Sequence, residues 1–157
     1  MRAAIETPAA IRPSHMAHLV IKTGCYEESV AWYRKFFDPE VVFADDFLTL
    51  LTYDDEHHRI AIVKPPDVEP HNDKAAGIDH VAFSFASMAD LVSNYERLKN
   101  LGIQPFWCIN HGHTTSMYYQ DPDGAQIEIQ VHNTAADTVD RPRTPPTRVA
   151  LSSIRTS

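Results

Sequence analysis

The chain repeats one order of secondary-structure signals, with an offset of about sixty residues between the two copies. In the first copy, an alternating strand pattern over residues 15–23 precedes a helical pattern over residues 26–37. Three more short strands are predicted after this helix, over residues 40–44, 47–52 and 59–63. The first copy is therefore expected to contain a strand, a helix and three strands.

The second copy shows the same succession of patterns. Residues 78–85 alternate as a strand, and Ser87 then provides an N-cap for a helix that Gly102 ends. Three strands are predicted to follow, over residues 104–109, 115–120 and 126–131. The match in order between the two copies predicts an internal duplication.

One helix and four short strands are too few to bury a core alone, so the two copies are expected to share one. The predicted fold class is α+β, with two tandem βαβββ modules that form one open, cup-shaped β-barrel with the helices outside. We expect a flexible arm at 1–13, the first module at 14–64, a linker at 65–76, the second module at 77–133 and a disordered tail at 134–157.

Composition argues against several functional classes. The 14 Lys and Arg residues stand against 21 Asp and Glu, for a net charge of −7, which disfavours binding to nucleic acid or an anionic membrane. The longest apolar runs, such as residues 47–51, are far shorter than the roughly 20 residues of a membrane span. Cys25 and Cys108 make no disulfide framework and no secretory signal is visible, so a cytoplasmic location is expected.

Matching positions of the two copies hold candidate metal ligands. His18 and His80, two of nine histidines, lie at equivalent points of the first strand of each copy. Glu128 lies between two isoleucines of the last strand, so its side chain faces away from both and needs water or a cation. The residue that matches Glu128 in the first copy is Ala61, which cannot bind a metal.

Two imidazoles and one carboxylate on one concave face form a facial triad with open coordination positions, which suits non-haem Fe(II) oxygen chemistry. The predicted metal ligands are therefore His18, His80 and Glu128. A hydrolase- or isomerase-type site with four protein ligands would need a Glu, Gln or His in the place of Ala61.

Four segments carry a resemblance to a known family: AHLVIKT, YDDEHHRIAIV, GIDHVAFSF and NHGHTTSMYYQDPDGAQIEIQ. The chain resembles the vicinal oxygen chelate superfamily and, within it, short single-domain type I extradiol ring-cleavage dioxygenases of the catechol and biphenyl-diol kind. The last segment is the most specific, because it combines a histidine, an aromatic pair ending in tyrosine, a D-P-x-G turn and a glutamate. The resemblance implies Fe(II), or Mn(II) as the less frequent metal, at the three predicted ligands.

The resemblance also implies roles for three residues outside the metal ligands. It assigns His58 the role of the acid–base residue. His111 corresponds to the histidine that opens the family's signature, and Tyr118 to the tyrosine ten residues before the metal-binding glutamate. His113 competes with His111, which is preferred because the motif begins there. His58 precedes Ile60 by two positions, so both share one side of the strand only if the hairpin is regular.

The implied function is extradiol dioxygenase activity. Such an enzyme uses Fe(II) and O2 to cleave the aromatic ring of a catechol-type substrate, biphenyl-2,3-diol or a related compound, next to the hydroxyls. The expected partners are therefore a small aromatic diol and O2, with no nucleic acid and no membrane. A homo-oligomer is also expected.

Two alternatives on the same fold remain. One is a glyoxalase- or epimerase-like lyase or isomerase, but Ala61 disfavours it because such sites usually employ a fourth protein ligand. The other is a metal-free drug-binding resistance module, which would need the cavity but not His18, His80 and Glu128 together.

Overall fold

The computed structural model describes residues 10–69, 71–72, 74–133 and 147–148. Its first module contains β1 (Leu19–Lys22), α1 (Tyr26–Phe37), β2 (Glu40–Ala44), β3 (Leu48–Thr52) and β4 (Ile60–Val63). The strands form one sheet in the order β1-β4-β3-β2, in which β1 and β4 are parallel and the other neighbours antiparallel. The predicted order of elements in the first copy is confirmed.

The second module repeats this plan with β5 (His80–Phe85), α2 (Met88–Asn100), β6 (Trp107–Asn110), β7 (Thr114–Gln120) and β8 (Gln126–His132). Its sheet has the order β5-β8-β7-β6-β9, where the added strand β9 (Thr147–Arg148) pairs with β6. The sequence patterns did not predict β9. The rest of the expected tail, and residues 1–9 of the expected arm, lie outside the described residues.

Local sequence explains where the two helices begin and end. The Ser87 hydroxyl accepts a hydrogen bond from the Asp90 amide at 3.1 Å, which caps the first turn of α2. Helix α1 carries two glutamates in its first turn and two basic residues in its last, as the helix dipole favours. It ends at Asp38, whose left-handed backbone (φ 49°) lets its amide donate to the Arg34 carbonyl.

Strand register confirms that the two modules are equivalent residue by residue. Val20 on β1 pairs with Ala61 on β4, and Ala82 on β5 pairs with Glu128 on β8. His18 precedes Val20 by two positions, as His80 precedes Ala82. The sequence match of Ala61 to Glu128 is therefore a structural match as well.

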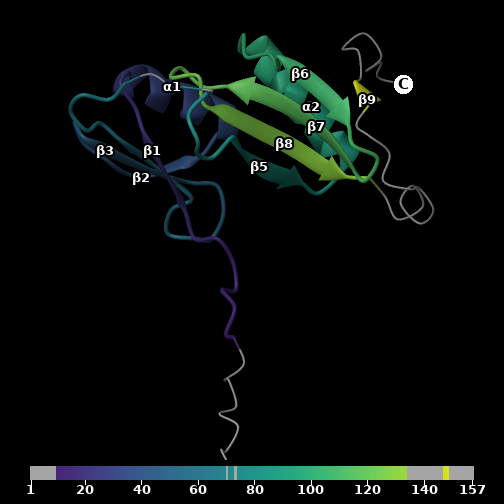
Figure 1. The fold of residues 1–157 in the computed structure, drawn as a ribbon, viewed down its shortest axis with the longest axis horizontal. Helices are drawn as coiled ribbons and strands as arrows, with labels where there is room; N and C mark the ends of the chain where they lie inside the picture. The colour runs from purple at the N-terminus through teal and green to yellow at the C-terminus, as the bar shows by residue number, and fades with distance from the viewer. Residues whose placement is uncertain (1–9, 70, 73, 134–146, 149–157) are drawn as a thin grey trace, which may run out of the picture.

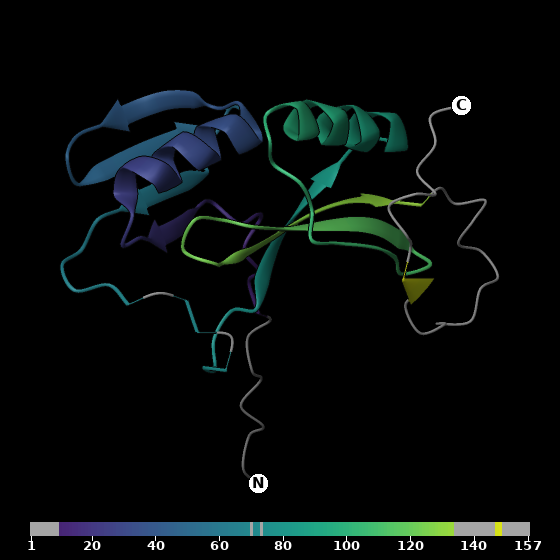
Figure 2. The same ribbon diagram turned by 90° about the horizontal axis from the view of Figure 1, so that it is seen from above.

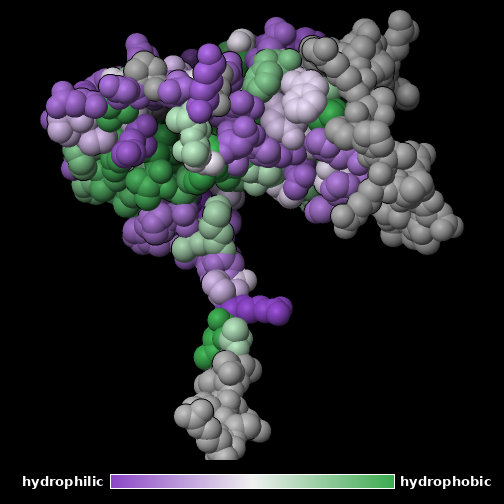
Figure 3. All heavy atoms as spheres, viewed as in Figure 1, coloured by the Kyte–Doolittle hydropathy of each residue, from purple (hydrophilic) through white to green (hydrophobic). Residues whose placement is uncertain are grey.

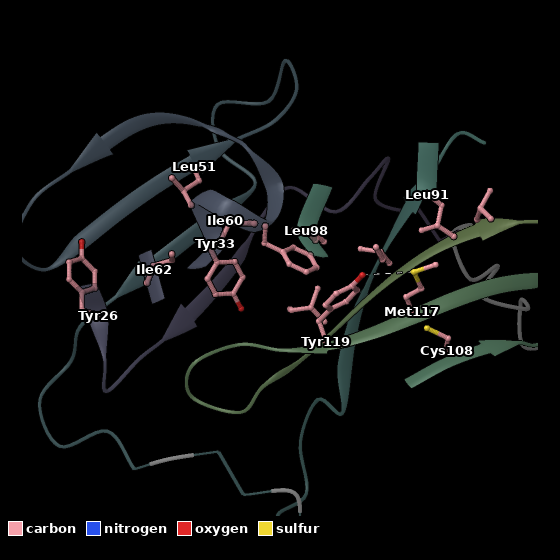
Figure 4. Packing of buried hydrophobic residues seen from close by; sticks show 14 residues of the cluster. Tyr26, Tyr33, Leu51, Ile60, Ile62, Leu91, Leu98, Cys108, Met117 and Tyr119 are labelled. Carbon is pink, nitrogen blue, oxygen red and sulfur yellow. Dashed lines mark hydrogen bonds between the residues drawn. The ribbon is translucent and has the colours of Figure 1, made fainter. Parts of the chain in front are cut away.

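The hydrophobic core lies between each helix and one face of its sheet, and it continues from one module to the next. Figure 4 shows Tyr33 of α1 beside Ile60 and Ile62 of β4, and Leu91 and Leu98 of α2 beside the second sheet. The ring of Phe36 meets that of Tyr119 edge to face at 5.0 Å, which joins the two halves. Each helix thus covers only one face of its sheet.

The opposite faces of the two sheets do not close around a common interior. Figures 1 and 2 show the two modules side by side, with α2 over one face of the five-stranded sheet and the other face open. The predicted pair of modules and the external helices are confirmed. The arrangement is an open cup, and the sheets of one chain do not form a closed barrel.

Within the residues that the structure describes, no helix is both long enough and apolar enough to cross a membrane.

Candidate active site

The buried carboxylate of Glu128 lies beside His80 on the open face of the second sheet. The distance from His80 Nε2 to Glu128 Oε2 is 3.0 Å, and the glutamate side chain is only 7% exposed. On the other side of the ring, Nδ1 of His80 lies 2.7 Å from Oδ2 of Asp79. Asp79 therefore holds the imidazole so that Nε2 faces Glu128. In metal-binding histidines, a carboxylate on the second ring nitrogen often orients the ring in the same way.

An aromatic wall continues from Glu128 across the open face of this sheet. Tyr118 pairs with Glu128 and Trp107 pairs with Tyr118, so the three side chains share one face. The Trp107 and Tyr118 rings stack at 4.8 Å and 27°, and the half-buried Trp107 borders the open side. This row combines an acidic group, a phenol and a flat apolar surface.

The phenol of Tyr118 remains protonated at neutral pH. Burial first, and then the neighbouring carboxylate of Glu128, raise the pKa of Tyr118 to about 12. Its hydroxyl lies 3.3 Å from Nε2 of His111, whereas His113 is exposed and its ring is 6.4 Å from that of His111. Of the two competing histidines, His111 is the one in contact with Tyr118.

The other two predicted residues lie together in the first module. His18 comes just before β1, and its ring stacks on that of His58 at 4.5 Å and 28°. Partial burial first, and then the nearby His18 and His57, lower the pKa of His58 below its ordinary value. His58 is therefore neutral at pH 7 and able to accept a proton.

The position of His58 does not follow the strand parity of Ile60. Ile60 is fully buried on the helix-covered side, while His58 stacks on His18 beside the opposite face. The hairpin before β4 is irregular: the Thr52 hydroxyl donates to the carbonyls of Asp54 and Glu56, which holds the loop in a compact turn. The hairpin is therefore not regular, and the side of the strand on which Ile60 lies does not predict the side on which His58 lies.

The same row of the first sheet is apolar. Val20, Ala61, Leu50 and Phe43 are successive neighbours across β1, β4, β3 and β2, in the positions that Ala82, Glu128, Tyr118 and Trp107 hold in the second sheet. The two modules therefore place different chemistry on equivalent faces. One carries the carboxylate and the phenol, and the other carries only aliphatic and phenyl groups beside two imidazoles.

The three predicted metal ligands do not meet within one chain. His80 and Glu128 are in contact, whereas His18 lies with His58 in the other module. Among residues 10–69, 71–72, 74–133 and 147–148, no group of three or more His, Cys, Asp or Glu side chains is placed to hold a metal ion. The three predicted ligands are therefore not gathered at one point among these residues, and the ligand set stays a prediction.

Sequence reasoning missed Trp107 as a candidate site residue. It lies within the strand predicted over residues 104–109, and its partner Tyr118 was singled out. The only available signal was an aromatic side chain on a short strand, which most often indicates core packing. Trp107 lies at the open side of the row because of the register of β6 with β7. This register cannot be predicted from the local sequence pattern.

Residues 15–129 match the model of the Glyoxalase/Bleomycin resistance protein/Dioxygenase superfamily. The chain belongs to this superfamily. The superfamily that the sequence motifs indicated is therefore confirmed.

Two proteins of Rhodococcus globerulus are similar in sequence. Biphenyl-2,3-diol 1,2-dioxygenase 2 is 45% identical over 118 residues, which are 74% of this chain and 62% of that protein. Biphenyl-2,3-diol 1,2-dioxygenase 3 is 37% identical over 122 residues, which are 76% of this chain and 64% of that protein. The chain thus spans less than two thirds of the length of these curated relatives.

A solved structure shares the fold at low sequence identity. A glyoxylase/bleomycin resistance protein/dioxygenase domain from Frankia sp. EAN1pec superposes with a TM-score of 0.65 at 19% identity, covering 79% of this chain and 96% of that one. At this identity the likeness bears on the fold alone, and it agrees with the two-module architecture described above.

Proposed function

We propose that this protein is an extradiol dioxygenase, which uses a non-haem Fe(II) centre and O2 to open the ring of a catechol-type diol, biphenyl-2,3-diol or a related compound. The observation that carries the proposal is the contact of buried Glu128 with His80, on the same face as the phenol of Tyr118. The names of the two similar Rhodococcus proteins support the same reaction class.

The proposed ligand set determines which metal chemistry is available. Two histidines and one carboxylate leave adjacent positions free, so a bound Fe(II), or Mn(II) as the alternative, would hold the diol oxygens next to O2. His18, His80 and Glu128 are the proposed ligands. Ala61 stands where a fourth ligand would be needed, which favours this reaction over glyoxalase-like isomerase chemistry.

The residues of the second module suit an aromatic diol. The Tyr118 hydroxyl is protonated at neutral pH, so it can donate a hydrogen bond to an ionised substrate oxygen. Trp107 offers its ring next to Tyr118, and His111 borders the same hydroxyl. A flat apolar ring with two adjacent hydroxyls would match this combination.

Proton transfer is proposed for His58. Its lowered pKa keeps the imidazole neutral at pH 7, so it can take a proton from a substrate hydroxyl and return it to the product. In the overall reaction the ring bond next to the hydroxyls breaks and both oxygen atoms of O2 enter the product. The base is needed because a diol binds to a metal in its deprotonated form.

Compartment and assembly complete the proposal. Cys25 and Cys108 are free thiols among the described residues, which suits a reducing cytoplasm. The net charge of −7 argues against nucleic acid and anionic membranes as partners. We propose a small aromatic diol and O2 as the substrates and a homo-oligomer as the assembly.

The test is an anaerobic purification, loading with Fe(II), and mixing with catechol or biphenyl-2,3-diol in air-saturated buffer. A yellow ring-opened product together with equimolar O2 uptake would support the proposal, and Tyr118→Phe should lower the rate with iron retained. Conversion of a hemithioacetal without O2 uptake would support the isomerase alternative. A protein that retains no metal but binds an aromatic drug would support the resistance-module alternative.

A further inference from the structure

The ring of His58 contacts the ring of the residue that precedes it. Nδ1 of His57 lies 2.9 Å from Nδ1 of His58, and the two rings meet edge to face at 5.2 Å and 84°. A hydrogen bond between two neutral imidazoles contains one proton, so one nitrogen donates and the other accepts. The direction of this bond therefore decides which nitrogen of His58 carries its proton.

The backbone next to His58 is held in place by Arg59. The Arg59 guanidinium donates to the carbonyls of Met16 and Ala17 at 2.7 Å and 3.1 Å. These contacts fasten the loop before β4 to the segment that carries His18. They set the position of His58 in the chain, but they do not involve its ring.

Stacking on His18 fixes the plane of the His58 ring but not its direction within that plane. The two rings lie 4.5 Å apart at 28°. A half-turn of the His58 ring about its Cβ–Cγ bond keeps the plane and exchanges the places of nitrogens and carbons. A contact at one particular nitrogen is needed to distinguish the two directions, and the contact with His57 at Nδ1 does so.

The surface beside His58 is poor in other polar partners. The neighbouring row of the first sheet is apolar, and it includes Val20, which is 51% exposed, and Phe43, which is 46% exposed. Figure 3 shows hydrophobic side chains gathered over the area where Figure 1 draws β1, β2 and β3. Among the described residues, Nε2 of His58 makes no hydrogen bond.

These surroundings determine the direction of the hydrogen bond. A proton on Nε2 of His58 would have no acceptor among the residues that the structure describes, whereas a proton on Nδ1 has the His57 nitrogen at 2.9 Å. His57 is exposed, so water can accept from its own Nε2. With His58 as donor and His57 as acceptor, both rings are satisfied. Nε2 of His58 then keeps its lone pair and can accept a proton.

We propose that His57 is a positioning residue, whose Nδ1 accepts the Nδ1–H of His58 and so keeps the lone pair of His58 on Nε2. The inference rests on the proposed function, because it gives the proposed base its orientation. A substrate hydroxyl transfers its proton to Nε2, and the electrons of its O–H bond stay on the oxygen. The hydrogen bond from Nδ1 to His57 persists through this transfer, and the proton later returns from Nε2 to the product.

The second module contains a parallel arrangement. Asp79, which precedes His80, lies 2.7 Å from Nδ1 of His80 and orients that ring. The two partners differ in charge. A carboxylate makes the ring more basic, which suits a metal ligand. A neutral imidazole orients the ring without adding a charge, which suits a base that must release its proton again.

The first test is NMR spectroscopy of the metal-free, isotope-labelled protein, and it needs no substrate. Long-range proton–nitrogen correlation spectra show which ring nitrogen of each histidine carries the proton, and His58→Gln assigns the His58 signals. At a pH where both histidines are neutral, His58 of the wild type should be protonated on Nδ1. His57→Leu should lose this preference, because leucine has no acceptor.

His57→Asn is the conservative variant. The Oδ1 atom of asparagine takes nearly the place of the histidine Nδ1 and can accept the same hydrogen bond, so His58 should stay protonated on Nδ1. His132→Leu is the control for the loss of an exposed histidine and should leave the His58 signals unchanged. Thermal unfolding checks that each variant folds.

The second test is steady-state kinetics of the iron-loaded variants with a diol. His57→Leu should lower kcat by about 2- to 10-fold, the change in population that one net hydrogen bond supports, with KM and iron content unchanged. His57→Asn should restore kcat. A merely structural role of His57 would not separate kcat from KM or be rescued by asparagine.

Protonation of His58 on Nε2 in the wild type would overturn the inference, as would His57→Leu with an unchanged spectrum and an unchanged kcat. The proposed function would stand in both cases, provided that the wild type cleaves a diol. A wild type that cleaves no diol would instead overturn the proposed function and the catalytic part of the inference. The spectra would still decide the orientation of His58, because they are measured without metal.

Discussion

Ala61 and Glu128 occupy the same position in the two repeats, since Ala61 pairs with Val20 as Glu128 pairs with Ala82. The backbone geometry is repeated, but the chemistry is not. A methyl group in one sheet replaces a carboxylate in the other, and a leucine stands where the other sheet has the phenol of its neighbouring tyrosine. This asymmetry places the polar groups of the row on the second sheet and leaves the row of the first sheet apolar.

Replacement of Glu128 should remove metal binding without harm to the fold. Glu128→Gln keeps the shape of the side chain but removes its charge, so the variant should lose Fe(II) on desalting. Its metal-free form should unfold near the wild-type temperature, because glutamine has the size of glutamate and its amide oxygen can still accept a hydrogen bond from the His80 ring. Elemental analysis and thermal unfolding measure the two effects.

Glu96→Gln is the matched control for this change. Glu96 lies on α2 and forms an exposed contact with Lys99 at 3.7 Å. Iron content and unfolding temperature should both remain at wild-type values. Full iron retention by Glu128→Gln would contradict its role as a ligand.

His58→Gln should keep iron and lose turnover by roughly 10²–10⁴, the usual contribution of a positioned acid or base. Because the pKa of His58 is lowered, the neutral base persists below its ordinary titration range. The acid limb of kcat/KM for the wild type should therefore lie below about pH 6.5, the ordinary value for histidine. Steady-state kinetics from pH 5 to 9, with iron measured in every sample, provides the check.

The exposed His132 serves as the comparison for His58. His132→Gln should leave both kcat and the pH profile unchanged. If His58→Gln keeps its turnover, His111 becomes the next candidate for proton transfer, because it contacts the Tyr118 hydroxyl.

Local pattern was sufficient to predict the repeat and its strands. The alternation of side chains along a strand predicted that Glu128 faces away from Ile127 and Ile129. The structure agrees, because both isoleucines are buried on the helix-covered side of the sheet. The first strand was predicted too long, over residues 15–23 instead of Leu19–Lys22. The carbonyls of Met16 and Ala17 accept from the Arg59 guanidinium instead of from a strand, and no local pattern contains that contact.

The relation between the modules could not be predicted from sequence. The contact of Thr23 with Asp123 joins residues one hundred positions apart, and either residue alone is an ordinary turn former. The division of His18 from Glu128 depends on this long-range packing. Residue types and repeat positions predicted three metal ligands, whereas the placement of these side chains on two faces required three-dimensional information.

Trp107 should influence which diols are accepted. Its ring stacks on Tyr118 at the open side of the row, where the second ring of a bicyclic diol could extend. Trp107→Leu should lower kcat/KM for biphenyl-2,3-diol relative to catechol by about 2- to 10-fold, the value of one aromatic pair. The ratio of the two kcat/KM values, measured on iron-matched samples, is the readout.

A change at Trp32 controls for the loss of a tryptophan. Trp32 lies on α1, where its ring stacks on Phe36 at 4.5 Å. Trp32→Phe should leave the substrate ratio unchanged even if stability falls. Equal effects of both variants on the two diols would mean that Trp107 supports the fold and does not select substrate.

Asp123→Ala should destabilise the junction of the two modules. Thr23 and Ser29 would lose their acceptor while still buried, which costs about 1–3 kcal/mol of unfolding free energy at pH 7. Partial burial acts to raise the pKa of Asp123, but hydrogen bonds from Thr23, Gly24 and Ser29 outweigh it and lower the pKa overall. The stabilising contribution is therefore complete above the ordinary carboxyl pKa and is lost as the pH falls through the lower folded-state value.

Urea unfolding of the wild type and Asp123→Ala at pH 7 and in acid measures this contribution. The difference between the two proteins should be largest at pH 7 and should shrink in acid, where Asp123 is protonated in both the folded and the unfolded chain. Asp46→Ala is the control, because Asp46 is an exposed residue of the turn between β2 and β3. A difference that grows as the pH falls would mean that the Asp123 carboxylate opposes the junction and that these hydrogen bonds do not stabilise it.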